Sequence, residues 1–442
     1  MSRSRSFVWS WGAGTRGQLG NAAFADSLEP VQLSKFDGSE ATSPPSWHGV
    51  VNDMACGGAH AVAILSVSND GEEQAQVMSW GNGESGALGH GRTDDLSVPK
   101  VVEFFSGIRV SSVAAGWSHT AFVTLSGALY TCGSGSFGQL GHGDFGERLI
   151  PFQVEFVSSK RVVMAACGMR HTLVLTNDRG TPEQTSVFSF GAGRRGQLGL
   201  SRLDLLQQEH SSSRKLVKVS VPKEVAELTR RANDEVVELV AANGDHSAAI
   251  TSYGHLFVWG RGFCGDSDYF EPRQVKNQQA PSVPSFKSHF CGWNHFTYVS
   301  LGWNHGLALG IDGVLWAWGS NQRGQVGTSD GEKPVSVSFS SETCAQDGDC
   351  IDQQWPKMVR VHGITGKCLI SSAGSEHSAA LCDSGEVRVW GWGEHGQLGL
   401  GDTSDVPLPQ VVSLPGDFHK DSLTWRVFCG SGFTFVVANQ ND

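Results

Sequence analysis

The sequence has few charged residues and no long apolar run. Charged residues make up 17% of its 442 residues, the formal net charge is −11, and the only basic start is Arg3 with Arg5. Such a surface repels phosphate backbones, so we expect no direct nucleic-acid binding. No run of about 18 apolar residues occurs, so we expect no helical membrane span. A β-forming segment begins at position 7, so we expect no signal or transit peptide.

Familiar motifs of catalysis and metal binding are also missing. The sequence has no His-Glu-x-x-His, no Walker loop and no Cys-x-x-Cys. Gly12-x-Gly14-x-x-Gly17 matches a dinucleotide fingerprint, but copies of it recur along the chain and run into Gln-Leu-Gly instead of opening a helix. We therefore expect no enzyme activity, no cofactor and no metal. An enzyme site in a central channel is the remote alternative.

Ten cysteines are spread along the chain without a disulfide pattern. Cys56, Cys167 and Cys429 each stand before a glycine in a recurring turn, where cysteine alternates with alanine as a small core residue. This usage indicates reduced thiols and an intracellular protein. Cys344 and Cys350 lie in an acidic insertion; a disulfide or a metal site is the alternative there to a solvated loop, which we favour.

The 56 glycines occupy fixed places in an internal repeat. Each unit contains a Gly-x-x-His, then a Trp-Gly-x-Gly-x-x-Gly-Gln-Leu-Gly, then a Pro-x-x-Val, or a variant of these signals. The second signal begins at Trp11, Trp80, Cys132, Phe190, Trp259, Trp318 and Trp390. The histidine slot holds His60, His119, His171, His246, His305, His377 and, in the last copy, Phe433. A glycine- and β-rich unit of this length indicates a blade reused around a ring.

The two ends of the chain are complementary halves of one unit. The chain opens within a repeat at Phe7–Trp11 and ends within one at Thr434–Val437. Neither half buries its apolar face alone, and closing the ring removes the exposed strand edges. The sequence predicts one all-β domain over residues 1–442, a seven-bladed propeller closed by its terminal strands. The expected blades are residues 50–105, 110–156, 162–226, 236–280, 296–362, 368–415, and 424–438 completed by 5–35.

The six repeat histidines have one occurrence per blade, so a ring keeps them apart. This spacing argues against a shared metal site. We expect each imidazole to be buried and to bond turn backbone through its ring nitrogens.

The two residues between glycine and histidine vary while their neighbours repeat. If these turns line one mouth of the ring, the variable residues form a surface for a protein partner, with tryptophan and arginine as anchors. The candidate partner-binding residues are Trp117, Arg170, Asp245, Trp303, Asn304 and Glu376. The alternative is that the insertions at 201–232 and 329–354 carry partner binding, because long loops often bear function.

The Trp-Gly-x-Gly-x-x-Gly-Gln-Leu-Gly signal, together with Ala-Gly-Trp-Ser-His-Thr at 115–120, resembles the regulator of chromosome condensation family over the whole chain. The resemblance implies a seven-bladed propeller. Members include the exchange factor for the small GTPase Ran and a plant ultraviolet-B photoreceptor. It therefore implies a non-enzymatic interaction scaffold, with exchange on a Ran-like GTPase as the specific expectation. Photoreceptor-like signalling is the alternative.

Particular residues carry these two implications. Gly244-Asp245-His246 resembles the acidic turn by which the exchange factor engages its GTPase, and the hairpin at Asn177–Ser186 is the candidate wedge. The photoreceptor stacks tryptophans from Gly-Trp-Arg-His-Thr turns. Here Trp117 and Trp303 belong to the second and fifth units and no Gly-Trp-Arg-His occurs, which argues against a coupled tryptophan cluster. We expect a monomer in the cytoplasm or nucleus, and the repeat sequences are most similar in character to those of plant members.

Overall fold

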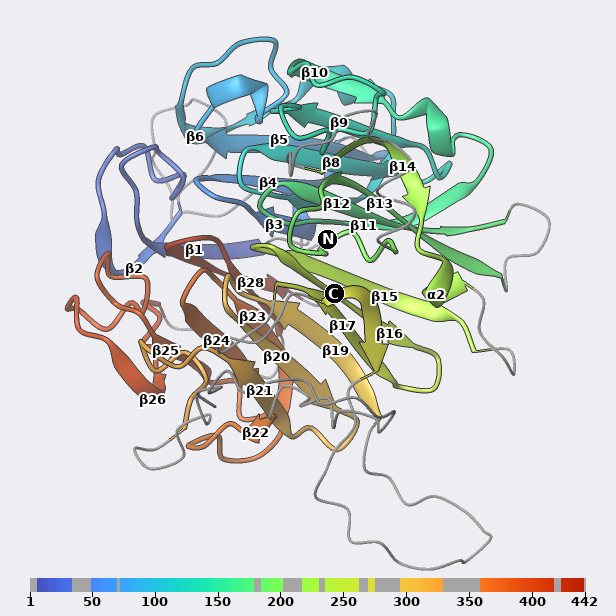
Figure 1. Ribbon diagram of the computed structural model, residues 1–442. Coiled ribbons are helices and arrows are strands. Elements are labelled where there is room, and N and C mark those ends of the chain that lie inside the picture. Colours follow the sequence, from blue (N-terminus) through green and yellow to red (C-terminus); the bar gives the residue numbers. More distant parts are fainter. Residues whose placement is uncertain are drawn as a thin grey trace, which may run out of the picture.

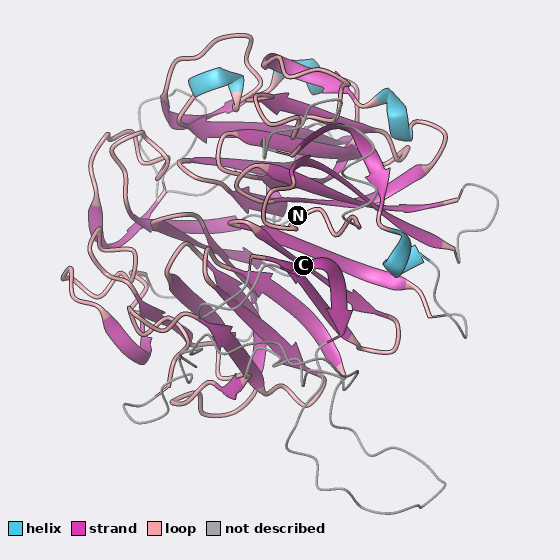
Figure 2. Ribbon diagram, viewed as in Figure 1, coloured by secondary structure: helices cyan, strands magenta, loops and turns pink. Residues whose placement is uncertain are grey.

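The computed structural model shows an all-β protein in which strands make up nearly all the regular structure (Figure 2). It describes residues 6–33, 49–69, 72–178, 184–201, 217–229, 235–261, 269–274, 295–328, 358–416 and 423–440. The strands form seven four-stranded antiparallel sheets. The predicted seven-bladed propeller is confirmed. No helix within the described ranges is long and apolar enough to cross a membrane.

Blades 1 to 4 each place four consecutive strands in chain order (Figure 1). Blade 1 contains β3 (Val50–Cys56), β4 (His60–Asn69), β5 (Glu72–Gly81) and β6 (Leu96–Val101). Blade 2 contains β7 (Val110–Ala115), β8 (His119–Thr124), β9 (Leu129–Gly133) and β10 (Arg148–Gln153). Blade 3 contains β11 (Arg161–Cys167), β12 (His171–Asn177), β13 (Thr185–Ala192) and β14 (Lys218–Glu224). Blade 4 contains β15 (Val237–Asn243), β16 (His246–Thr251), β17 (Leu256–Gly260) and β18 (Tyr269–Gln274).

Blades 5 and 6 follow the same plan, and blade 7 combines the two ends of the chain. Blade 5 contains β19 (Phe296–Leu301), β20 (His305–Gly310), β21 (Leu315–Gly319) and β22 (Val359–Arg360). Blade 6 contains β23 (Cys368–Ala373), β24 (His377–Cys382), β25 (Val387–Gly391) and β26 (Val406–Val411). Blade 7 contains β27 (Leu423–Cys429), β28 (Phe433–Gln440), β1 (Ser6–Gly12) and β2 (Ser27–Gln32). Short helices are η1 (Glu84–Gly86), η2 (Glu103–Phe105), η3 (Glu155–Val157) and α2 (Ala226–Thr229).

The ring closes as predicted. Each first strand contacts the first strand of the next blade, and β27 of blade 7 contacts β3 of blade 1. Within blade 7, β1 pairs antiparallel with β28, with Trp11 opposite Thr434 and Val8 opposite Val437. Figure 1 shows this blue strand beside the red C-terminal ones. The first and last segments of the chain therefore depend on one another for their ladder hydrogen bonds.

Buried tryptophans join neighbouring blades. Trp80 is fully buried, and its indole Nε1 donates to the backbone carbonyl of Gln18 in the preceding blade at 3.0 Å. Trp11, Trp259 and Trp390 make the same contact, at 2.9 Å, with the glutamine carbonyl of the equivalent loop in the preceding blade. The glycine that ends this loop is needed for the fit: a Cβ on Gly399 would lie 2.8 Å from the Trp11 indole nitrogen. The second repeat signal thus forms a contact between neighbouring blades.

The repeat histidines are buried, but their partners differ from the expectation. In blade 2, His119 Nε2 lies 2.9 Å from the Thr172 hydroxyl of blade 3, and that hydroxyl donates to the Gln139 carbonyl at 2.8 Å. The same pairing joins His60 to Thr120, His171 to Ser247, His305 to Ser378 and His377 to Thr434. At these five histidines the Nε2 partner is a hydroxyl and not the expected turn backbone, whereas a backbone hydrogen bond of His377 with Phe433 and one of His246 with His305 agree with the expectation. A hydroxyl both accepts and donates, so it links imidazole to carbonyl across the blade boundary.

Some predicted features need correction or lie outside the described residues. The insertion expected over 201–232 is interrupted, because β14 and α2 occupy Lys218–Thr229. The rest of that insertion at 202–216 and 230–232, and all of 329–354 with Cys344 and Cys350, are not among the described residues. The same holds for 179–183 of the predicted wedge hairpin.

Candidate interaction site

The Gly-x-x-His turns gather around one mouth of the propeller, where each connects the first strand of a blade to the second. Backbone hydrogen bonds join turns of adjacent blades, including Gly58 N to Gly116 O at 3.0 Å and Trp303 N to Ser375 O at 2.9 Å. In five of the turns the first glycine makes room for the histidine: a Cβ on Gly116 would lie 2.2 Å from His119 Cε1. The turns therefore form a fixed frame that presents variable side chains.

Two of the predicted residues meet across this mouth. Trp117 of blade 2 and Trp303 of blade 5 have ring centroids 5.2 Å apart, with planes at 45°. Trp117 is 44% exposed, and Trp303 is partly buried. The expectation that their separate blades keep these rings apart is wrong. A large residue at the inner edge of a turn reaches over the axis, where the seven blades converge.

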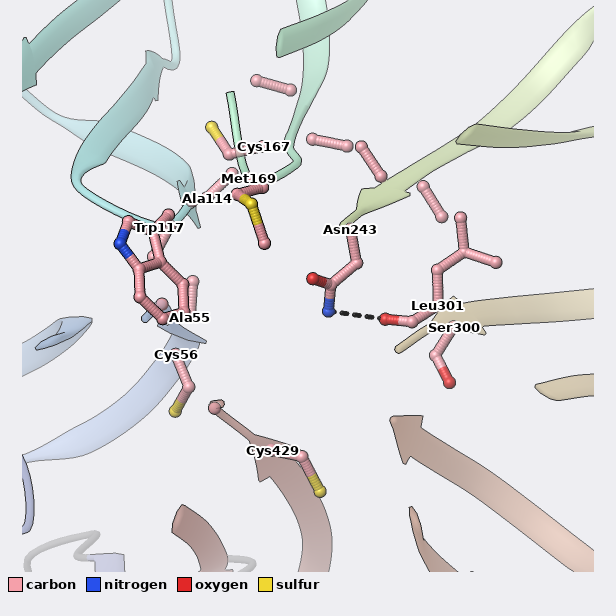
Figure 3. A pocket seen from close by; sticks show the side chains of 18 of the residues that line it. Ala55, Cys56, Ala114, Trp117, Cys167, Met169, Asn243, Ser300, Leu301 and Cys429 are labelled. Carbon is pink, nitrogen blue, oxygen red and sulfur yellow. Dashed lines mark hydrogen bonds between the residues drawn. The ribbon is translucent and has the colours of Figure 1, made fainter. Parts of the chain in front are cut away.

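A cavity of about 260 Å³ lies against the tryptophan pair. Its walls are largely small side chains of the first strands, such as Ala55 and Ala114 (Figure 3). Trp117 and Trp303 also line it. Asn243 projects into it and donates from its side-chain amide to the Leu301 carbonyl at 2.7 Å. Asn243 stands where the other turns begin with glycine, and it links blade 4 to blade 5 at this point.

The titratable groups of this cavity are neutral at physiological pH. Burial raises the pKa of the Cys167 and Cys429 thiols to about 12, and raises that of Cys56 well above its ordinary value. Burial also raises the pKa of the Tyr298 hydroxyl to about 12. The six cysteines that the structure describes are free thiols. Since thiolate is the reactive form, the raised pKa values keep Cys56, Cys167 and Cys429 in the less reactive thiol form. No three His, Cys, Asp or Glu side chains of the described ranges are grouped to hold a metal.

The charged candidates lie around the tryptophan pair and contact the glycine-rich loops, which are the loops that the second repeat signal forms between the third and fourth strands of a blade. Arg170 is exposed, and its guanidinium carbon lies 4.7 Å from the centre of the Phe137 ring. Asp245 is half-buried and accepts a hydrogen bond from the Gln197 side-chain amide at 3.1 Å. The turns and the glycine-rich loops are therefore parts of one surface.

The remaining two candidates belong to the same surface. Glu376 is half-buried, and its carboxylate lies 4.0 Å from Arg323 of a glycine-rich loop. Asn304 is half-buried in the turn that follows Trp303, and its backbone carbonyl accepts from Ser320 N at 2.7 Å. Sequence reasoning missed the loop residues Phe137 and Arg323. Comparison of equivalent repeat positions in the glycine-rich loops is the signal that finds them.

The comparisons with known proteins agree with this architecture. A family model described as the RCC1-like domain matches residues 7–436, nearly the whole chain. The chain belongs to the RCC1-like domain family. Among relatives, the ultraviolet-B receptor UVR8 of Arabidopsis thaliana is 32% identical over 92% of this chain and 78% of its own length. The secretion-regulating guanine nucleotide exchange factor of Mus musculus is 30% identical over 97% of this chain and 83% of its own length.

Solved structures of this family share the fold at low sequence identity. Prp20p of Saccharomyces cerevisiae superposes with a TM-score of 0.71 at 20% identity, covering 100% of this chain and 93% of that one. Its structure was described with its binding to Gsp1p and histones. At this identity the likeness shows the fold alone, because RCC1-like propellers carry different functions on one frame.

Proposed function

We propose that this RCC1-like propeller is a non-enzymatic protein-interaction scaffold whose working face is the mouth with the tryptophan pair. The observation that carries the proposal is the contact of Trp117 with Trp303 on a rigid ring of turns. Exposed aromatic anchors surrounded by charged side chains are the composition of an interaction hot spot. We further propose that it acts as a monomer in the cytoplasm or nucleus.

The specific partner that we propose is a Ran-like small GTPase, with the propeller acting as its nucleotide exchange factor. Support comes from the relative named as a guanine nucleotide exchange factor and from Asp245, whose carboxylate Gln197 positions on the mouth. Exchange requires that propeller and nucleotide weaken each other's binding to the GTPase. A coupling of about 1–3 kcal/mol corresponds to about 5- to 150-fold, and it is reciprocal.

Release of a fluorescent GDP from a purified Ran-like GTPase tests this proposal. The propeller should accelerate release, and Asp245→Ala or Trp117→Ala should abolish the acceleration while the melting temperature changes by only a few degrees. Arg109→Ala is the matched control, because Arg109 is exposed at the opposite mouth, where Leu125 N bonds its carbonyl at 2.9 Å. If no GTPase of a small panel responds, exchange is refuted; if a partner binds but mouth variants match the control, the scaffold face is wrong.

The tryptophan pair also supports a second candidate, ultraviolet-B sensing. Rings 5.2 Å apart are close enough for their excited states to interact, and a relative at 32% identity is named as an ultraviolet-B receptor. Near-ultraviolet circular dichroism should then show a coupled tryptophan signal that Trp303→Phe removes. Size-exclusion chromatography before and after ultraviolet-B illumination should show a change of elution. An unchanged elution volume with an intact spectrum would exclude this candidate.

A further inference from the structure

The glycine-rich loops are joined around the mouth by a repeated charge pair. A basic residue of one loop contacts an aspartate that stands four residues before the proline of the next blade. The pairs are Arg16–Asp95 at 3.2 Å, Arg323–Asp405 at 3.0 Å and His395–Asp26 at 3.1 Å. Each aspartate also accepts the N–H of a glycine in its own loop, at 2.9–3.0 Å. The aspartate therefore has two local roles, which explains an acid at this place.

Blade 3 reverses the charge at this place. Six blades have an acid four residues before the proline, namely Asp26, Asp95, Glu147, Asp268, Asp352 and Asp405. Blade 3 has Lys218. The loop position that faces it in blade 2 holds Phe137, where four other blades have a basic residue, namely Arg16, Arg195, Arg323 and His395. Lys218 Nζ lies 4.9 Å from the centre of the Phe137 ring and donates to the Ser136 carbonyl at 2.8 Å. A cation–π contact thus replaces the charge pair.

The reversal leaves positive charge without a carboxylate. Arg170 shares the Phe137 ring with Lys218, which also lies 5.5 Å from the ring centre of Phe145, itself 50% exposed. Arg194 is exposed in the adjoining loop of blade 3. Within the described ranges, none of these three cations forms an ion pair. We call Phe137, Phe145, Arg170, Arg194 and Lys218 the basic sector.

We propose that the basic sector binds an acidic peptide segment of a partner protein. Carboxylates of the segment meet the cations of Arg170, Arg194 and Lys218, and an apolar side chain packs on the exposed ring of Phe145. Charge complementarity argues for a short acidic peptide, because the net charge of −11 disfavours a long polyanion such as a nucleic acid. This inference rests on the proposed function, since it assigns a partner chemistry to one part of the same mouth.

The probe for the test is a fluorescein-labelled peptide of ten glutamates with a central phenylalanine, followed by anisotropy at low salt. The variants are Lys218→Asp, which copies the residue of five other blades, and Arg194→Glu in an exposed loop. Each should weaken binding at least about tenfold, and raised salt should weaken it further. Arg109→Glu makes the same charge change as Arg194→Glu at the opposite mouth and should stay within about twofold of the parent. Melting temperatures identify any variant that does not fold.

Three results would overturn the proposal. One is an equal loss in Arg109→Glu, which would mean attraction by net charge alone. The second is a ten-nucleotide dT strand that binds more tightly than the peptide. The third is a protein that elutes as a dimer and binds the peptide only after the dimer dissociates, which would mean that a second copy covers the basic sector. The proposed function fails separately, because it is refuted if Trp117→Ala leaves partner binding intact. If Trp117→Ala abolishes partner binding and Lys218→Asp leaves it unchanged, only the proposal for the basic sector is refuted.

Discussion

Mild acid should unfold this propeller, because its blades are joined through neutral buried imidazoles. Burial lowers the pKa of His60 from 6.5 to about 4. It lowers the pKa of the other five repeat histidines to about 3; these are His119, His171, His246, His305 and His377. All six are at most 2% exposed. Protonation of any of them in the folded state places an uncompensated charge between two blades.

The sign follows from the direction of these pKa shifts. The folded pKa lies below the unfolded one, so the unfolded chain binds more protons between about pH 3 and 6.5. The stability is complete above about pH 6.5 and falls as the pH is lowered below that value. At pH 5.5 each imidazole costs roughly 1–2 kcal/mol, and six together cost roughly 6–10 kcal/mol. The whole free energy of unfolding of a typical domain is about 5–15 kcal/mol, so the transition should fall near pH 5–6.

Thermal melts followed by tryptophan fluorescence and circular dichroism across pH 4–8 measure this effect. The junction between blades 7 and 1 provides the design of a matched variant, because the equivalent residues there are Phe433 and Ala61. His119→Phe with Thr172→Ala copies that junction and removes one titrating imidazole. The double variant should keep more of its stability at pH 5.5 relative to pH 7.5, whereas Thr172→Ala alone should not.

The reasoning fails if the melting temperature at pH 5 equals that at pH 7.5. It also fails if the double variant, folded at pH 7.5, loses stability with acid as steeply as the parent. Either outcome would mean that the buried imidazoles do not control acid unfolding.

Two further predictions concern stability. Deleting residues 1–12 removes β1 with the fully buried Trp9 and Trp11. Loss of each of these side chains should lower the free energy of unfolding by on the order of 3–5 kcal/mol, so we expect no soluble folded protein. An unchanged melting temperature would refute closure by β1. Gly399→Ala places a methyl group 2.8 Å from the Trp11 indole, at a backbone φ of +65°. It should lower the free energy of unfolding, measured by chemical denaturation, by roughly 2 kcal/mol or more. The control Gly91→Ala should lower it by about 1 kcal/mol, because its nearest neighbour is at 3.5 Å. Equal losses would show that the indole contact does not matter.

Much of the architecture could be predicted from the sequence, because each repeat contains the same local pattern of strand- and turn-forming residues. Glycines at turns, alternating apolar strands and a proline at the outer edge specify one blade. The half-units at Phe7–Trp11 and Thr434–Val437 specify that the ring closes. Burial of the repeat histidines and the position of the candidate residues in the Gly-x-x-His turns follow from the same periodicity.

The partners of these residues are decided only by the tertiary structure. A histidine finds its hydroxyl in the next blade, at the residue that follows the histidine position of that blade, so the pairing of His119 with Thr172 depends on how neighbouring blades are placed. Trp117 and Trp303 belong to nonadjacent blades and touch because the first strands converge on one axis. In the sequence Lys218 cannot be distinguished from an ordinary surface lysine; only the assembled ring brings it against Phe137 of the preceding blade. Periodicity determines the frame of each blade, whereas closure of the ring determines which side chains of different blades meet.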